Sequence, residues 1–453
     1  VQIQSINNVD AANTKVVAMG STVGIYGAEG NVSIDGITSQ MSKVAVNAGK
    51  KLNVKGSVNS TGSLLSLIGL EETHIGGSVT ATDSSSTIGS NGDVTFDKNV
   101  SFKNTVLTSG NSNVDLQVGS ISTALTASGT STTSNETTEA NNDTPNLDVN
   151  KLIGTIQGKV KDIEEYNSTI EGKNVTVKGS LNATNDLLAI GRGHAVEKLA
   201  VNGDTTLDNS VVMINSSGDV VTNGLKAKDA FVFINAKDIK AKDIDTSVSD
   251  SSKFISYLET ANEKFAVDNN MTMKNTVLNS KYTTNIAVGG AGDFNTTVLN
   301  IPNANAQFGS LKTENTMVSL QNNQANNTIS VTGDYTVAGD NLFYMDFDPA
   351  TGAYDRVHVG GAITGADGAT ITVNSNLVNK GDVANGYQIY DVFQGNNGVS
   401  GVSFGLQGET AYSTALANYQ MESLGSGKYA FRRTGYTPTA LVNPVAVQLG
   451  GFL

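Results

Sequence analysis

The sequence has no cysteine and no tryptophan, and only 16% of its 453 residues are charged. Without cysteine, the chain has no disulfide, no thiolate metal site and no thiol nucleophile. A typical soluble domain is roughly 25% charged, and the deficit here excludes a coiled coil or a charged helical bundle. Glycine, with 48 residues, and the small polar residues Asn, Ser and Thr take the place of the charged ones.

Positive charge and long apolar runs are also scarce. The net charge is −13, and the only four arginines are Arg192, Arg356, Arg432 and Arg433. Phosphate recognition needs clustered Lys and Arg, so we predict no nucleic-acid partner and no attraction to anionic membranes. No apolar run has the length of a membrane span, which predicts no membrane insertion. No signal peptide is visible, so we expect that any targeting segment has been removed.

What the chain does contain is internal repetition. GKKLNVKGSVNSTGSLLSLIG from Gly49 aligns without a gap to GKNVTVKGSLNATNDLLAIG from Gly172. FDKNVSFKNTVLTS from Phe96 aligns in the same way to VDNNMTMKNTVLNS from Val267. The repeated unit is a short strand, a turn and another short strand. Repeats of this length are typical of solenoids, in which each turn buries its apolar side chains only against its neighbours.

The alternation within a repeat predicts how its strands lie. Val175 and Val177 alternate with Asn174, Thr176 and Lys178, which is the period of a half-buried strand. We therefore predict an all-β protein whose residues 1–334 form a parallel β-helix with roughly 20 residues per turn. An antiparallel sandwich or barrel is the alternative, but it normally has more aromatic residues in its core than this region offers.

Two interruptions are expected in this rod. Residues 121–148 are rich in Ser, Thr and Asn, which predicts an exposed loop. In the segment from Ser249, Phe254, Leu258 and Ala261 share one helical face, and Asp250 or Ser251 could cap it. We therefore predict a short helix over residues 251–263.

The composition changes near residue 335. The segment 335–453 holds 15 of the 27 Phe and Tyr residues. An open solenoid end exposes unpaired backbone groups and apolar interior. We therefore predict that this aromatic-rich segment forms a β module that caps the solenoid.

The motifs of this segment resemble a known family. They are the Asp-Arg pair that opens a strand (Asp355–Val357), a Gly-x-x-x-Gly pair (Gly361, Gly365), a Tyr-rich strand (Tyr387–Phe393) and a final Gly-x-Tyr-x-Phe strand (Gly427–Phe431). In this order they resemble the pertactin-like C-terminal end of type V autotransporter passenger domains. The resemblance covers about the last quarter of the chain.

The resemblance implies a right-handed parallel β-helix whose end segment assists its folding at the cell surface. It also implies that the chain is a processed passenger, cut from its translocator barrel and exported through the periplasm and outer membrane. The expected localisation is therefore extracellular or at the bacterial cell surface.

Candidate catalytic and metal residues are few. No Gly-Asp-Ser-Gly nucleophile motif is present. His74 and His194 are expected in corners between strands and His358 on a strand, all as scaffold residues. The segment GGAGDFNTT from Gly289 resembles one Ca²⁺-binding nonapeptide, but it occurs once. We predict no catalytic residue, no cofactor and no metal, and an enzyme acting on polysaccharides, or a toxin, remains an alternative.

Five asparagines fit the extended acceptor pattern Asp/Glu-x-Asn-x-Ser/Thr of bacterial N-glycosylation: Asn31, Asn99, Asn167, Asn270 and Asn295. They are candidate glycosylation sites. The alternative, which we favour, is that the turns of the repeat themselves select Asp, Asn and Thr.

These observations predict a surface-displayed passenger that acts in adhesion and self-association. Its expected partners are other copies of itself and surface glycans, because a rod with polar faces offers many weak contacts that add up. A self-assembling filament or surface-layer subunit is the second structural alternative.

Overall fold

The computed structural model describes residues 1–104, 153–154, 167–247 and 256–436. The chain divides into two compact units, one of residues 1–119 and 150–268 and the other of residues 120–149 and 269–453. The described residues are almost entirely strand, and helix is confined to Ile153–Gly154 and a 3₁₀ turn, η2, at Ala384–Gly386. The predicted all-β parallel solenoid is confirmed, with about 13 turns in the two units together.

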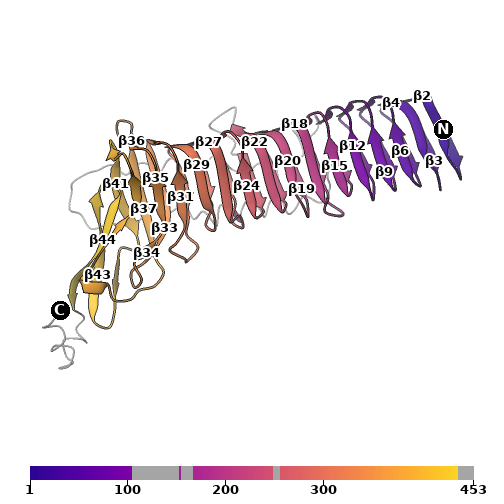
Figure 1. The fold of residues 1–453 in the computed structure, drawn as a ribbon. Helices are drawn as coiled ribbons and strands as arrows, with labels where there is room; N and C mark the ends of the chain where they lie inside the picture. The colour runs from indigo at the N-terminus through magenta and orange to yellow at the C-terminus, as the bar shows by residue number, and fades with distance from the viewer. Residues whose placement is uncertain (105–152, 155–166, 248–255, 437–453) are drawn as a thin grey trace. The chain divides into compact units, whose positions relative to one another are not determined.

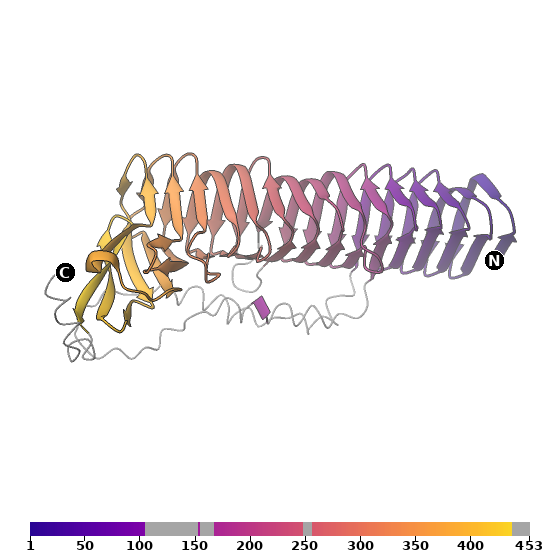
Figure 2. The ribbon, with the colours of Figure 1, turned by 60° about the horizontal axis from the view of Figure 1, so that its bottom comes forward.

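The first unit has two parallel sheets, which form the two rows of arrows in Figure 2. One sheet, here called sheet A, contains β1 (Gln2–Ser5), β3 (Thr22–Gly27), β5 (Lys43–Ala48), β8 (Leu64–Gly69), β11 (Ser85–Gly89), β14 (Ser168–Glu171), β17 (Leu187–Ile190), β19 (Val211–Asn215), β21 (Phe231–Asn235) and β23 (Ser256–Ala261). The other, sheet B, contains β2 (Val9–Met19), β4 (Val32–Gln40), β6 (Lys51–Val54), β7 (Val58–Thr61), β9 (Glu72–Ile75), β10 (Val79–Thr82), β12 (Asp93–Phe96), β13 (Val100–Lys103), β15 (Asn174–Val177), β16 (Leu181–Thr184), β18 (Lys198–Asp208), β20 (Val220–Lys228), β22 (Asp238–Ser247) and β24 (Lys264–Val267).

The core of this unit consists of apolar ladders, because each strand pairs in register with the strand one turn away. In sheet A one such ladder is Val46, Leu67, Ile88, Ile170, Ile190, Ile214 and Ile234, all buried. In Figure 1 the strands of this unit follow one another as parallel arrows. Val175 and Val177 point into the core while Asn174 and Thr176 are half-buried, as the alternation predicts.

The two aligned repeats fold in the same way. The repeat from Gly49 gives β6, β7 and β8, and the repeat from Gly172 gives β15, β16 and β17. Residues 104–167 separate β13 from β14 in the sequence, whereas only residues 83 and 84 separate β10 from β11. Register is nevertheless kept on both sides of this segment, because Ser86 pairs with Ser168 and Val100 pairs with Leu181.

The second unit continues the same architecture with strands of both sheets. Its sheet A strands are β26 (Thr276–Asn279), β28 (Val298–Asn300), β30 (Met317–Ser319), β33 (Asp340–Asp348), β34 (Ala353–Tyr354), β37 (Thr370–Leu377) and β41 (Ser403–Gly408). Its sheet B strands are β25 (Met271–Lys274), β27 (Asn285–Asn295), β29 (Asn305–Glu314), β31 (Thr328–Val331), β32 (Tyr335–Ala338), β35 (Arg356–Val359), β36 (Ile363–Gly365), β39 (Phe393–Gly395) and β40 (Val399–Ser400).

A four-stranded antiparallel sheet completes this unit. It contains β38 (Tyr387–Asp391), β42 (Ala411–Ser413), β43 (Ala417–Gly425) and β44 (Lys428–Tyr436). Aromatic rings join it to the solenoid strand β33: Phe347 lies 5.5 Å from Tyr390, and Tyr390 lies 5.7 Å from Phe431. Edge-to-face contacts of this kind stabilise beyond the area that they bury. The aromatic cluster near the C-terminus therefore packs on the last solenoid turns of this unit.

The helix predicted over residues 251–263 is wrong where the structure describes it. Residues 256–261 form β23, in which Leu258 pairs with Val232 and Thr260 with Ile234. Leu258 and Thr260 are buried on one side of the strand, so a period of two prevails over the helical spacing. Pairing with the neighbouring turn favours the strand over the helix, because a helix would leave the backbone of β21 unpaired at the edge where β23 lies. Residues 251–255 and the predicted loop at 121–148 lie outside the described residues.

Candidate binding groove and predicted acceptor sites

The first unit has a groove of about 840 Å³ along one corner of its solenoid. At this corner sheet B ends and sheet A begins in each turn. Each corner starts with a residue in the left-handed region, such as Gly20 (φ 54°), Gly62 (φ 56°) or Asp83 (φ 50°). Glycine and aspartate adopt this conformation at low cost. With Met41 (φ 44°) between Gly20 and Gly62, these left-handed residues recur at 21-residue spacing.

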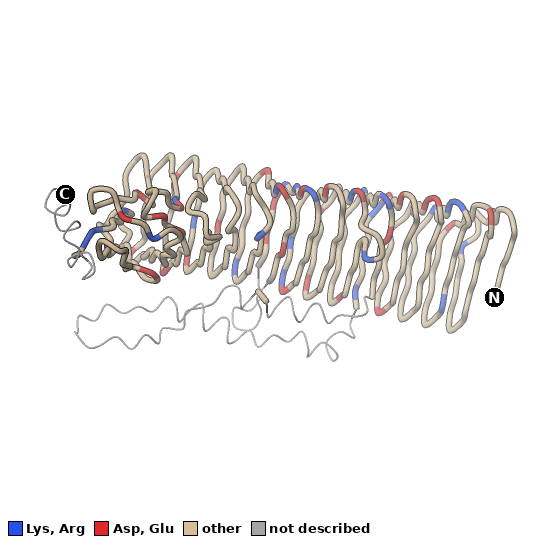
Figure 3. Tube along the Cα trace, turned by 90° about the horizontal axis from the view of Figure 1, so that it is seen from below, with Lys and Arg blue, Asp and Glu red and all other residues tan. Residues whose placement is uncertain are grey.

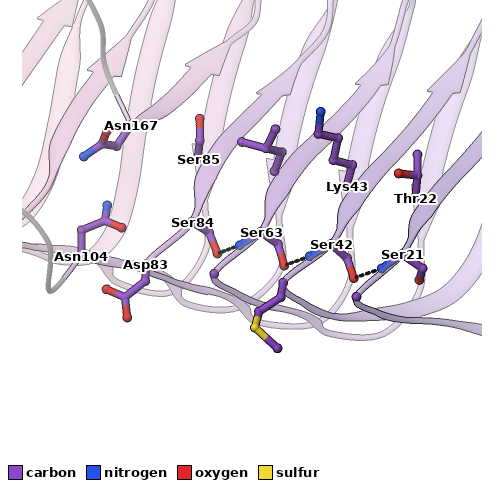
Figure 4. Close-up of a pocket in the computed structure, with 14 residues that line it drawn as sticks. Ser21, Thr22, Ser42, Lys43, Ser63, Asp83, Ser84, Ser85, Asn104 and Asn167 are labelled. Atoms are coloured by element: carbon purple, nitrogen blue, oxygen red, sulfur yellow. Dashed lines mark hydrogen bonds between the residues drawn. The ribbon is translucent and has the colours of Figure 1, made fainter.

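A serine follows each left-handed residue and builds a hydrogen-bond ladder (Figure 4). The backbone N–H of Ser21 donates to Oγ of Ser42 over 3.2 Å, and that of Ser42 donates to Oγ of Ser63 over 3.1 Å. The N–H of Ser63 in turn donates to Oγ of Ser84 over 3.2 Å. The hydroxyls of Ser42, Ser63 and Ser84 also donate to the carbonyl two residues earlier in their own turn. The ladder thus pairs both the corner backbone and the serine hydroxyls.

The open side of the groove combines small polar and apolar side chains. Thr22, Lys43 and Ser85 lie on one side of the serine ladder and Asp83 on the other (Figure 4). Among the described residues, Lys43 and Asp83 are the only charged ones that line the groove. Elsewhere on this unit acidic and basic residues are interspersed (Figure 3), as in the ion pair between Lys51 and Glu72.

Three predicted acceptor asparagines have one structural role. Oδ1 of Asn31 accepts the N–H of Lys51 over 3.1 Å, and Oδ1 of Asn99 accepts the N–H of Ser180 over 3.0 Å. Asn270 does the same for the N–H of Ala291 over 2.8 Å. All three are exposed, Asn31 at the corner between β3 and β4, and Asn99 and Asn270 at the corners within sheet B that precede β13 and β25. The turn therefore needs asparagine at these positions whether or not a glycan is added, because its amide pairs a backbone donor of the next turn.

The other two acceptor asparagines differ. Asn167 is half-buried and lines the groove. Asn295 is half-buried in β27, and its Nδ2, the atom that would carry a glycan, donates to Glu314 over 2.8 Å. The structure does not bring the five asparagines together, and a glycan on Asn295 would displace this hydrogen bond.

The histidines are scattered among scaffold positions. His74 was predicted to lie in a corner, and this prediction is wrong. It lies within β9, because Glu72–Ile75 pair with the strands on both sides. His194 lies in a bend, and His358 lies in β35 as predicted. Nε2 of His74 lies 2.9 Å from Asp97. Hydrogen bonds from Lys178 and His74 hold the pKa of Asp97 below its usual range.

Two buried carboxylates were missed by sequence reasoning. Burial raises the pKa of Asp186 to about 6, while Asn104 donates to its Oδ1. Burial raises the pKa of Asp355 to about 8, although its two oxygens accept the N–H groups of Asn327 and Asp346 over 2.8 and 2.7 Å. Shifted carboxyls are candidates for acid–base chemistry. Here, however, the oxygens of Asp355 hold loop backbone, and Oδ1 of Asp186 accepts from the side chain of Asn104, which are structural roles.

Metal and membrane features were also compared with the sequence predictions. Within residues 1–104, 153–154, 167–247 and 256–436, no three His, Asp or Glu side chains are grouped so that they could hold a metal ion. In the same ranges no helix has the length and apolar character needed to cross a membrane. No family model matches the chain, and no curated protein matches it.

Proposed function

We propose that the chain is an autotransporter-like passenger that acts outside the cell in adhesion and self-association. The observation that carries the proposal is the architecture: a parallel solenoid whose second unit ends in an aromatic antiparallel sheet. The motifs that resemble passenger ends form this region, since Asp355–Val357 lead into β35, Tyr387–Asp391 form β38 and Lys428–Tyr436 form β44.

Adhesion and self-association fit the surface better than catalysis does. The same polar side chains recur once per turn, so that contacts of small individual strength repeat along the solenoid. The two buried carboxyls of shifted pKa lie in different units, and each is engaged by its own scaffold. Surface glycans and further copies of the chain are the partners that we propose, at the bacterial surface or in the medium.

The test compares association with catalysis on the purified full chain. Sedimentation velocity over a hundredfold range of protein concentration should reveal reversible association, and a glycan array should reveal carbohydrate binding. Electron microscopy of the same samples distinguishes discrete oligomers from filaments, which would favour the filament alternative. A chain that stays monomeric, binds no glycan and depolymerises an acidic polysaccharide would overturn the proposal in favour of an enzyme.

A further inference from the structure

Sheet A of the first unit has an outward row of apolar side chains that are buried. Four residues, one in each successive turn, pair in register and are at most 8% exposed: Leu187, Val211, Phe231 and Tyr257. Each comes one residue before an interior side chain, as Val211 comes before Val212. Because successive side chains of a strand point to opposite faces, this row faces away from the core.

Sheet A of the second unit has a row of the same kind. Its members also pair in register, and their exposed fractions lie between 0% and 8%: Val277, Val298, Met317 and Leu342. Leu342 faces outward, because the next residue, Phe343, packs in the interior with its ring 5.1 Å from that of Phe393 in sheet B. The residues in register with Leu342 face outward for the same reason.

The equivalent positions are open in the first turns of the solenoid. Thr22, Lys43, Leu64 and Ser85 occupy them in β3, β5, β8 and β11, and all four are exposed. The geometry of a turn therefore does not itself bury this position. The described elements that pack closely on β19, β21 and β28 are their neighbours in sheet A, which do not cover an outward face. Strands with apolar residues on both faces, as these have, are typical of sheets covered on both sides.

The long connection between β13 and β14 starts beside this row. It leaves the solenoid at the corner where sheet B ends and sheet A begins. The row lies at the same edge, since Val211 and Phe231 are the first residues of β19 and β21. In extended form, a segment as long as residues 105–152 reaches about 80 Å out and back, whereas four stacked strands span only about 15 Å. The connection is therefore long enough to follow the row.

The division of the chain into units agrees with this placement. Residues 120–149 belong to the same compact unit as residues 269–453, whereas the chain on both sides of them belongs to the first unit. One continuous segment thus contributes to both units that have a buried outward row.

The sequence of this segment also offers an apolar face. Val114, Leu116 and Val118 alternate with Asn, Asp and Gln, so an extended chain would present three apolar side chains on one side. Ile153, which follows the segment, is only 6% exposed.

We propose that the outer face of sheet A, over β17–β23 in the first unit and β26–β33 in the second, is an interaction surface that residues 105–152 of the same chain occupy. Each part of the segment covers the row of its own unit. Burial of these apolar side chains stabilises the folded chain and leaves external partners to the open turns of sheet A and to sheet B. The proposal does not depend on the function proposed above.

Two other occupants fit these rows less well. A second copy of the chain is not needed, because the rows are already buried within a single chain. Residues 248–255 also lie between a strand of sheet B and one of sheet A, β22 and β23. A segment of that length, however, reaches only about 13 Å out and back, which is too short to cover the rows of both units.

The test uses single introduced cysteines, because the chain has none of its own. Val298→Cys places a thiol in the buried row, and Leu64→Cys is the matched control at an exposed equivalent position. In the full chain a maleimide should modify the thiol at position 298 roughly a hundredfold more slowly, because the reaction requires local opening. Deleting residues 105–166 leaves Asn104 and Asn167 as a corner as long as that between β10 and β11. This deletion should make the two rates similar.

Equal rates at the two positions in the full chain would show that the row is not covered and would overturn the proposal. Continued protection of position 298 in a shortened chain that keeps its circular dichroism spectrum would overturn the assignment to residues 105–152. If the shortened chain does not fold, cross-linking of the full chain decides. On irradiation, p-benzoylphenylalanine in place of Phe231 should attach to peptides from residues 105–152. Attachment only to peptides from elsewhere, residues 248–255 included, would refute the proposal.

Discussion

The backbone N–H of Ser42 donates to Oγ of Ser63, which lies 21 residues later and one solenoid turn away. The same hydroxyl donates to the carbonyl of Thr61 in its own turn. One side chain therefore links two turns and closes a corner, and the pattern repeats from Ser21 to Ser84. The spacing of small hydroxyl residues is thus a condition of the fold as well as a feature of the composition.

Replacing one ladder serine should destabilise the first unit. Ser63→Ala leaves the buried N–H of Ser42 without its acceptor, and we expect a loss of about 1–2 kcal/mol in the free energy of unfolding. Urea unfolding followed by circular dichroism measures this loss. Ser85→Ala is the control, because Ser85 is exposed and outside the ladder. Equal stability of the two variants would show that the ladder contributes nothing.

Asp186 should make stability depend on pH. Burial raises its folded pKa to about 6, above the usual value near 3.9 of an unfolded chain. The folded state therefore binds the proton more tightly, so its favourable contribution is complete below about pH 4 and is lost as pH rises through 6. Asp186→Asn should remove this dependence and raise stability at pH 8 by about 3 kcal/mol.

Unfolding of both proteins in urea at pH 4, 6 and 8 tests the effect of Asp186. Asp219→Asn, at an exposed position, should leave the pH profile unchanged. A slope between pH 6 and 8 should persist in all variants, because the pKa of Asp355 is raised to about 8. A profile of Asp186→Asn that is parallel to the wild type would contradict the assignment.

A hydroxyl pair inside the second unit offers a test of buried polar contacts. The hydroxyls of Thr313 and Tyr335 lie 2.8 Å apart in the solenoid interior, and both residues are buried. Tyr335→Phe should cost about 1 kcal/mol, since Thr313 loses its partner. Adding Thr313→Val should restore part of the loss, because both polar groups are then gone. If the double variant loses the sum of both single costs, the pair is not coupled.

The aromatic cap should be the most sensitive part of the second unit. Phe431 is fully buried between Tyr390 and Tyr412, with ring centroids 5.7 Å from each. Phe431→Ala should cost about 3–5 kcal/mol and reduce the near-ultraviolet signal, to which only tyrosine and phenylalanine contribute. Tyr387→Ala, at an exposed position of the same sheet, is the control. Equal melting temperatures of the two variants would argue against the cap.

The acceptor asparagines allow a direct measurement. Because Asn31 and Asn99 already serve the backbone of the next turn, we expect no glycan, and peptides of native material that contain these asparagines should have their unmodified masses. A mass increase that maps to Asn31 or Asn99 would show that these exposed amides are also modified. An increase that maps to Asn295 would require the hydrogen bond from its Nδ2 to Glu314 to be broken.

The fold could be predicted from the sequence because the evidence for it lies in short segments of the chain. Val175 and Val177 alternate with polar residues, and the repeat from Gly49 recurs at Gly172, so strand, turn and stacking follow from short segments. The helix predicted near Leu258 is wrong because the apolar residues there fit both a helical and a strand period. Only the pairing with the neighbouring strand β21 determines that a strand forms. The left-handed conformation of Met41 is equally invisible in sequence, because its equivalence to Gly20 and Gly62 appears only once the turns are aligned in space.

The corner between Lys103 and Ser168 has a consequence for how such a chain can diversify. The sequence between β13 and β14 spans residues 104–167, whereas that between β10 and β11 is two residues long, yet Ser86 still pairs with Ser168 and Val100 with Leu181. Since the cost of closing a loop grows only slowly with its length, the stack tolerates large additions at its corners while its interior stays the same. Evolution or a protein engineer can therefore insert new sequence at one turn without redesigning the turns beside it.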